Sequence, residues 1–321
     1  MKVSVLFPET RSVRHVISLA QRSETLGFHA MHLGGAFGID PVMALALAGP
    51  HTERIVLGTA VVPSWPRHPV VAAQQAATAN AACQGRFRFG IGPSHPPVMA
   101  MYGIDDTKPV GHTREYLTIV RALLRDGKVS FSGDHYRVQA FLDVEDGGAP
   151  PVMLAALHEQ MCRTAGALAD GVIPWLTPPS YVADVVIPAL KAGAATTGRE
   201  APPIVVQLPC YVSTDAAAVH EAARADLAIY VHMPAYADLL ATLIKADAKA
   251  LGTGGWTDAL TDAVVPWGDG AAITARLGEY EQAGASEVVL SPYGCGANAP
   301  RNFNDALEVL GDIARAQHAN D

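Results

Sequence analysis

Short apolar runs alternate with longer segments of helical periodicity from one end of the chain to the other. An apolar run bounded by turn residues is typical of a buried strand, and apolar positions three and four apart are typical of a helix. Strands are predicted at residues 3–7, 29–33, 54–62, 86–92, 151–156, 171–175, 203–212 and 287–290. Helices are predicted at residues 13–26, 41–48, 69–82, 113–125, 270–283 and 304–316.

Two segments interrupt this alternation. Near residues 128–138, apolar positions alternate around Ser132-Gly133-Asp134, which predicts a small hairpin. Near residues 216–256, the helical pattern is longer than a crossover between strands needs, which predicts a helical insertion. Both are expected to decorate a single domain that spans residues 1–321.

The alternation of eight strands with helices predicts an α/β fold, namely a (β/α)8 TIM barrel with insertions. A doubly wound open sheet is the alternative. The turn after the first strand, Pro8-Glu9-Thr10-Arg11, lacks the glycines of a dinucleotide-binding fingerprint. The barrel is therefore the favoured prediction.

Composition and charge indicate which kinds of binding partner and cellular compartment are expected. Of the 321 residues, 50% are hydrophobic and 17% are charged, which is enough apolar material for a large core. The net charge of -8 argues against binding to nucleic acid or to an anionic membrane. The first residues resemble a strand rather than a signal sequence, and no apolar run approaches a membrane span, so a cytoplasmic protein is expected. The four cysteines have no Cys-x-x-Cys spacing and fit buried thiols in a reducing compartment.

The end of the fourth predicted strand, Gly90-Ile91-Gly92-Pro93-Ser94-His95, is the richest candidate for chemistry. Glycines let a ligand approach the backbone closely, and α/β proteins bind ligands at the carboxyl ends of their parallel strands. Ser94 can hydrogen-bond a phosphate or a hydroxylated chain, and His95 can donate a proton. A loop histidine in solvent is the competing interpretation of His95.

Other strand ends offer weaker candidates. Thr59 and Ala60 follow a glycine inside the third strand, where they could contact a ligand or simply fill the barrel. Trp175 and Tyr293 end the sixth and eighth strands, where an aromatic ring can stack on a ligand or pack in the core. Glu9 follows the first strand and is a candidate to face the same rim.

Several chemistries are disfavoured. The first strand is followed by no His-x-His pair, and no Asp, Glu, His and Cys cluster has the spacing of metal ligands, so no metal site is expected. Neither a Gly-x-Ser-x-Gly nucleophile elbow nor a Walker loop occurs. His32, inside the second strand, is expected to be a core or barrel-lining residue.

Four segments follow one another in a recognisable order: RIVLGTAVVPSWPRHPVVAAQQA at 54–76, GRFRFGIGPSH at 85–95, HTREYLTIVRALLRDGKVSFSGDHYRV at 112–138 and PPVMLAALHEQMCRTAGALADGVIPWL at 150–176. AGASEVVLSPYG at 283–294 adds a fifth. In these segments the chain resembles the bacterial luciferase-like monooxygenase superfamily. It is most similar to the branch of oxidoreductases that depend on the deazaflavin coenzyme F420.

This resemblance implies a TIM-type barrel that holds an isoalloxazine-type ring at the carboxyl ends of its strands. In the family, the third strand has a bulge with a non-proline cis peptide under the ring, which matches Ala60–Val61 here. Residues 155–157 would lie on the ribityl and phosphate side of the cofactor. The implied cofactor-binding residues are Thr59, Ala60, Val61, Gly92, Pro93, Ser94, His95, Ala155, Ala156, Leu157 and Trp175.

One segment departs from the family pattern. Many relatives carry polar residues at the end of the second strand, whereas residues 33–37 read Leu-Gly-Gly-Ala-Phe. His95 falls where some relatives place an acidic residue that is proposed as proton donor. His95 is therefore the predicted catalytic residue.

The activity implied is that of an F420-dependent oxidoreductase, which transfers a hydride between the deazaflavin and a small organic substrate with a C=C, C=N or C=O bond or an alcohol. The substrate is expected to contact mostly apolar side chains from residues 34–40, Trp65, 175–179 and 230–256, with His232 and Tyr236 as polar contacts. A homodimer is also expected, because relatives often form dimers and the helix at 71–82 is small enough to pack across a two-fold axis.

Two alternatives remain open from the sequence. The first is an FMN-dependent monooxygenase on the same barrel, which needs oxygen and a flavin reductase as partner. The second is a non-catalytic flavin-type binding protein, which the missing polar residues after the second strand would fit.

Overall fold

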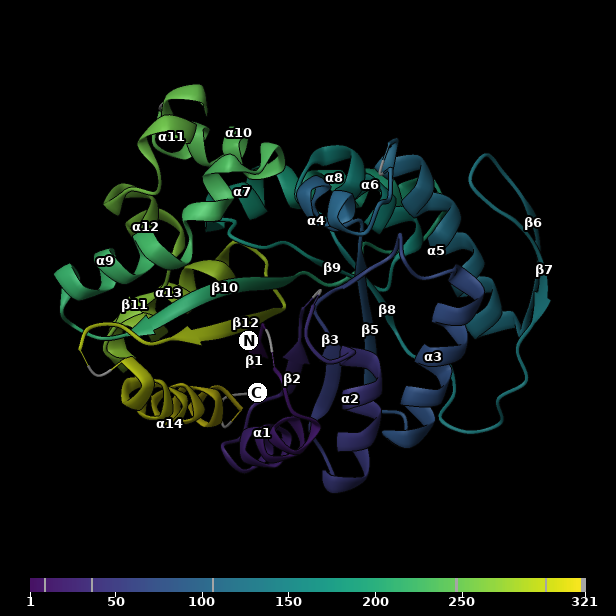
Figure 1. Cartoon of the computed structure of the whole chain (residues 1–321), viewed down its shortest axis with the longest axis horizontal. Coiled ribbons are helices and arrows are strands. Elements are labelled where there is room, and N and C mark those ends of the chain that lie inside the picture. Colours follow the sequence, from purple (N-terminus) through teal and green to yellow (C-terminus); the bar gives the residue numbers. More distant parts are fainter. Residues whose placement is uncertain (9, 36, 106, 246–247, 298, 319–321) are drawn as a thin grey trace.

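Strands and helices alternate along the chain, as the hydrophobic pattern predicts (Figure 1). The computed structural model describes residues 1–321 apart from 9, 36, 106, 246–247, 298 and 319–321, so the candidate Glu9 lies outside the described residues. The strands are β1 (Lys2–Phe7), β2 (Ala30–Leu33), β3 (Val56–Thr59), β4 (Val62–Pro63), β5 (Phe87–Gly92), β6 (Lys128–Ser132), β7 (Arg137–Phe141), β8 (Val152–Ala155), β9 (Gly171–Ile173), β10 (Val205–Val212), β11 (Trp267–Gly268) and β12 (Glu287–Tyr293).

The helices have the following bounds. They are α1 (Val13–Thr25), α2 (Pro41–Ala48), α3 (Pro69–Ala82), α4 (Pro96–Met101), α5 (Pro109–Asp126), α6 (Glu159–Leu168), α7 (Pro179–Tyr181), α8 (Ile187–Ala195), α9 (Ala216–Asp226), α10 (Pro234–Leu243), α11 (Ala248–Gly254), α12 (Asp258–Val264), α13 (Gly270–Gln282) and α14 (Ala299–His318). Short 3-10 or π segments are η1 (Gly49–His51), η2 (Val182–Val186) and η3 (Ala228–His232). None of the helices in the described ranges has both the length and the apolarity that crossing a membrane requires.

Eight strands form a ring of parallel strands. Ladders join neighbours in the order β10, β12, β1, β2, β3, β5, β8 and β9. Between the two ends of this order, the Gln207 N–H donates to the Pro174 carbonyl at 2.8 Å, and the Leu176 N–H donates to the Gln207 carbonyl at 3.2 Å. These bonds bring the segment after β9 beside β10 and complete the ring. The predicted (β/α)8 barrel is confirmed, and the open-sheet alternative is wrong.

The third predicted strand is broken in two. β3 ends at Thr59, and β4 resumes at Val62 and pairs with β5. Between them the Ala60–Val61 peptide bond is cis and does not involve proline. The family resemblance implied a bulge with such a bond at this position, and the structure confirms it.

Two layers of side chains fill the barrel. An apolar layer lies under the carboxyl ends of the strands and consists of Leu6, Ala60, Met153, Ile173, Val205 and Val289. A polar group near the start of β12 centres on Glu287, whose carboxylate accepts bonds of 2.6 Å from the Ser4 hydroxyl and from Arg88. His32 is 2% exposed, as expected for a core residue, and burial lowers its pKa to about 4. The interior is therefore a packed core, and a ligand has room only above it.

The two insertions lie outside the ring. The β6–β7 hairpin packs on α5 at the edge of the molecule and extends to Phe141, slightly beyond its predicted end (Figure 1). The segment from α9 to α12 forms a helical block with its own apolar cluster, shown in green in Figure 1, and continues to Val264. This block follows β10, so it stands beside the carboxyl ends of the barrel strands.

Candidate active site

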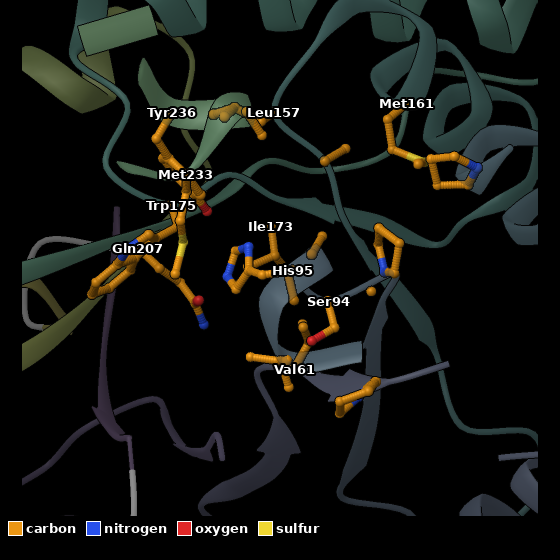
Figure 2. A pocket seen from close by; sticks show the side chains of 18 of the residues that line it. Val61, Ser94, His95, Leu157, Met161, Ile173, Trp175, Gln207, Met233 and Tyr236 are labelled. Atoms are coloured by element: carbon orange, nitrogen blue, oxygen red, sulfur yellow. The ribbon is translucent and has the colours of Figure 1, made fainter. Parts of the chain in front are cut away.

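A cavity of about 930 Å³ opens at the carboxyl ends of the barrel strands (Figure 2). Its walls come from residues at or next to the ends of β1, β2, β5, β8, β9 and β12, from Gln207 within β10, from the β3–β4 bulge, and from the helical block around α10. The lining is largely apolar, with a few polar groups directed inward. This size and character are typical of a site for a small-molecule ligand.

The structure brings together ten of the eleven predicted cofactor-binding residues. Those that line the cavity are Ala60, Val61, Gly92, Pro93, Ser94, His95, Ala155, Ala156, Leu157 and Trp175. Thr59 is not among them. Its hydroxyl donates to the Gly90 carbonyl at 2.7 Å and accepts from the Gly90 N–H at 2.9 Å. Thr59 therefore ties β3 to β5 behind the cavity wall.

Backbone rather than side chains shapes one side of the cavity. A Cβ on Gly92 would lie 2.9 Å from the Cβ of Ala155 and 3.0 Å from Cγ2 of Val61. Ser94 has φ +69°, a left-handed conformation that is uncommon outside glycine. Small residues at the ends of β5 and β8 thus leave a broad concave surface next to the Ala60–Val61 peptide.

The glycine that follows β2 has little room for a side chain. A Cβ on Gly34 would lie 3.1 Å from the Ala60 carbonyl oxygen and 3.4 Å from the Pro8 carbonyl oxygen. A side chain at position 34 would therefore press on the backbone of the β3–β4 bulge. Gly34 and Gly35 instead line the cavity with backbone.

His95 lies in the cavity between β5 and α4. Figure 2 shows its imidazole directed inward, and its ring centroid is 5.8 Å from that of Tyr236. Burial lowers the pKa of His95 below its ordinary value, so the neutral imidazole dominates at neutral pH. His95 is thus half-buried in the wall of the cavity rather than fully exposed to solvent.

Aromatic side chains form another wall of the cavity, next to His95. Trp175 comes from the barrel, and Tyr230 and Tyr236 come from the helical block. The ring centroids of Trp175 and Tyr230 are 6.0 Å apart, and those of Tyr230 and Tyr236 are 5.1 Å apart. Of the range 230–256, the first residues line the cavity, and their contact with substrate stays a prediction.

Two predicted pocket residues lie elsewhere. His232 is exposed and is not part of the lining. Trp65 stacks on His112, with ring centroids 3.5 Å apart, in an aromatic cluster behind the cavity. Both predictions rested on position in the sequence, which does not reveal the direction of a side chain in a loop.

Gln207 is the main lining residue that sequence reasoning missed. It lies on β10, is 4% exposed and lines the cavity. Its amide nitrogen is buried and has no hydrogen-bond partner among the described residues. The signal in the sequence is a lone polar residue in the apolar strand Val205-Val206-Gln207-Leu208, but that pattern alone does not distinguish a ligand contact from a core amide.

Charge is scarce around the cavity. The described residues that line it include no lysine or arginine, and its ionisable side chains apart from tyrosine are those of His95, His158 and Glu159. In the part of the chain that the structure describes, no three His, Cys, Asp or Glu side chains are grouped so as to hold a metal ion. The site is thus suited to an organic ligand that binds through backbone groups and apolar surface.

Comparison with known proteins gives a consistent result. The family model described as luciferase-like monooxygenase matches residues 1–287. The 5,10-methylenetetrahydromethanopterin reductase of Methanolobus tindarius is 26% identical over 97% of this chain and 98% of its own. A putative coenzyme F420-dependent oxidoreductase of Mycobacterium tuberculosis is 30% identical over 66% of this chain and 67% of its own.

Solved structures agree on the fold. The coenzyme F420-dependent tetrahydromethanopterin reductase of Methanopyrus kandleri superposes with a TM-score of 0.78 over 97% of both chains. Its sequence is 20% identical, so this similarity concerns the barrel itself and not the ligand.

Proposed function

The chain belongs to the luciferase-like monooxygenase family, and from that premise we propose that it is a coenzyme F420-dependent oxidoreductase. The reaction would be hydride transfer between the deazaflavin and a small organic substrate. The observation that carries this proposal is the shallow cradle beside the Ala60–Val61 bulge, at the carboxyl ends of the strands. Two relatives with related names, a methylenetetrahydromethanopterin reductase and an F420-dependent oxidoreductase, support it.

The residues present fit a flat tricyclic ring with a phosphorylated tail. Ala60, Val61 and Gly92 offer backbone and small side chains on which a ring can lie. On the other side of β5, residues 155–157 lead into α6, whose first residues also line the cavity. The N-cap residue His158 makes no side-chain hydrogen bond to the helix, so the first N–H groups of α6 are free to bind a phosphate oxygen.

When bound, the deazaflavin supplies a two-electron hydride carrier that has carbon in place of the reactive ring nitrogen of a flavin. The protein has to hold a substrate carbon over the ring, exclude water and move one proton. We assign this proton transfer to His95, because its imidazole lies in the cavity near the β5 end of the cradle. The neutral form that burial favours can accept a proton from an alcohol, and its conjugate acid can return one in the reverse direction.

A binding titration tests this proposal. The purified protein is titrated with F420 and, separately, with FMN, and the fluorescence of each is followed. We expect F420 to bind tightly and FMN weakly. The variant Ala155→Leu, which fills the cradle, should weaken F420 binding by about tenfold or more because the added carbons occupy ligand space. Ala195→Leu, on the exposed end of α8, is the matched control and should leave binding unchanged.

Two results would contradict the proposal. Tight FMN binding with oxygen consumption by the reduced complex would identify an FMN-dependent monooxygenase. Failure to bind either compound would indicate a barrel without redox chemistry.

A further inference from the structure

Gln207 uses its main-chain polar groups in the fold but not the nitrogen of its side-chain amide. Its backbone N–H and carbonyl pair with the segment after β9, but its side-chain nitrogen has no partner among the described residues. A buried donor without a partner costs free energy, and such a group in a ligand cavity is expected to pair with the ligand. The ligand atom that pairs with an N–H donor is an acceptor, such as a carbonyl or hydroxyl oxygen.

The position of Gln207 in the ring separates it from the proposed cofactor cradle. In the order of the eight barrel strands, β10 lies four strands from β3 in either direction, so the two are diametrically opposite. Figure 2 shows Gln207 beside Trp175 and Met233 on one side of the cavity, with Val61 and Ser94 on the other. A ring that lies on the Ala60–Val61 side therefore leaves the space in front of Gln207 for substrate.

The other side chains near this space limit the substrate further. Met233 and Tyr236 from the helical block and Trp175 from the barrel present apolar or aromatic surface. The described lining includes no lysine or arginine that could neutralise a phosphate or carboxylate on the substrate. A buried anion without a counter-charge is strongly disfavoured, so an uncharged substrate fits best.

We propose that Gln207 is a substrate-positioning residue whose carboxamide donates a hydrogen bond to the oxygen of an uncharged, largely apolar ketone or secondary alcohol. This assignment rests on the proposed function. In reduction, bound reduced deazaflavin would supply a hydride to the carbonyl carbon, the C=O π pair would move to oxygen, and protonated His95 would give that oxygen its proton. Oxidation of the alcohol is the reverse, with neutral His95 accepting the hydroxyl proton. Gln207 holds the oxygen in both directions.

The test compares two probes of nearly equal shape, cyclohexanone and methylenecyclohexane, which differ by an oxygen against a CH2 group. Their affinities are measured by ligand-observed NMR, with and without F420, for the wild type and for Gln207→Met and Gln207→Leu. In both variants the preference for the ketone over the alkene should fall by about tenfold, the usual effect of one lost hydrogen bond. F420 affinity should stay within about twofold of the wild type, because Gln207 lies across the ring from β3 and is not part of the cradle.

A stability measurement adds a second readout. Without ligand, the Gln207→Met protein should be at least as stable to heat as the wild type, because it no longer buries an unpaired amide. Gln139→Met, on the exposed face of the hairpin, is the matched control and should change neither the ketone preference nor the melting temperature.

The outcomes separate the two proposals. An unchanged ketone preference would overturn the assignment of Gln207. A fall in F420 affinity without a fall in ketone preference would do the same. Binding of glucose 6-phosphate as tight as that of cyclohexanone would overturn the uncharged substrate class. If wild-type protein fails to bind F420, the proposed function fails, and the ketone preference measured without cofactor still decides the role of Gln207.

Discussion

His95 is the side chain to which we assign proton transfer in this cavity, and it can act as base when neutral and as acid when protonated. Replacement of His95 by Asn keeps a polar side chain of similar size and removes the titratable group. Turnover should fall by about a hundredfold or more, the usual contribution of a general acid or base. F420 affinity should change little, because the cradle is built from the backbone of other residues. Equal losses of turnover and of F420 affinity would instead assign His95 to cofactor binding.

The pH profile of the wild type gives an independent check. Burial lowers the pKa of His95, so the neutral imidazole persists at more acidic pH than in a free histidine. Alcohol oxidation uses the neutral form, and its rate should stay high down to below about pH 6.5 and then fall. A steady-state profile of kcat/KM between pH 4.5 and pH 8 measures this acidic limb, the fall in rate toward low pH. The limb should be absent from the residual activity of His95→Asn.

The sequence locates site residues well where they end strands and poorly where they lie inside them. Gly92, Ser94 and His95 follow an apolar run, so their place at the rim follows from the barrel alone. Gln207 lies within such a run, and only the assembled ring shows that it lines the cavity. Trp65 shows the opposite error. It was predicted to contact the substrate because it lies in a loop at the rim, but it stacks on His112 and does not line the cavity.

At the scale of elements, the contact between β3 and β5 depends on one glycine. A Cβ at Gly90 would lie 2.0 Å from the Thr59 carbonyl oxygen, which belongs to the neighbouring strand and cannot rotate away. Gly90→Ala should therefore lower the free energy of unfolding by about 3 kcal/mol, the upper range for overpacking. Urea denaturation measures this change.

Gly278→Ala is the matched control for that prediction. Gly278 lies inside α13, and a Cβ there would meet no atom within 4 Å. Because alanine is the better helix former, this variant should be stabilised by up to about 1 kcal/mol. A similar destabilisation in both variants would show that the close approach of β3 to Gly90 is unimportant.

Element boundaries followed from the sequence except where the backbone leaves the regular pattern. Helices α2 and α3 occupy the predicted residues, and a proline at the first helical position marks the start of each. The run at 54–62 was predicted as one strand, since its apolar character continues through the cis peptide at Ala60–Val61. A hydrophobic pattern does not indicate where a strand bulges, so the break at Ala60–Val61 was predicted from the family resemblance.

At the scale of the whole molecule, the polar group inside the barrel links stability to pH. His32 is fully buried, and burial lowers its pKa to about 4 from an ordinary value of about 6.5. The folded state therefore requires neutral His32, whose contribution is complete above pH 6.5 and is lost as the pH falls toward 4. This difference corresponds to about 3 kcal/mol.

Glu287 adds to the same trend. Although burial raises its pKa, the Arg88 guanidinium and the hydrogen bond from the Ser4 hydroxyl hold that pKa below its ordinary value, so acid also removes this contribution. Urea denaturation at pH 7 and at pH 4.5 should show a marked loss of stability for the wild type. In His32→Leu the loss should be smaller, and an identical loss in the two proteins would contradict this role of His32.

The expected homodimer stays a prediction. Helices α2 and α3 are neighbours, and each exposes apolar side chains: Met43 and Leu47 on α2, and Val71 on α3. This face lies on the side of the barrel formed by the first half of the chain, away from the helical block (Figure 1). A two-fold contact there would leave the mouth of the cavity open.

The cavity draws its two sides from parts of the chain that can change independently. The cradle belongs to barrel strands and their ends within the first 160 residues, and much of the aromatic wall belongs to the helical block after β10. Descendants of one ancestor can therefore keep the same coenzyme while they exchange the block and acquire a new substrate. Similarity in the first half of such proteins then indicates a shared coenzyme, and similarity between residues 216 and 264 indicates a shared substrate.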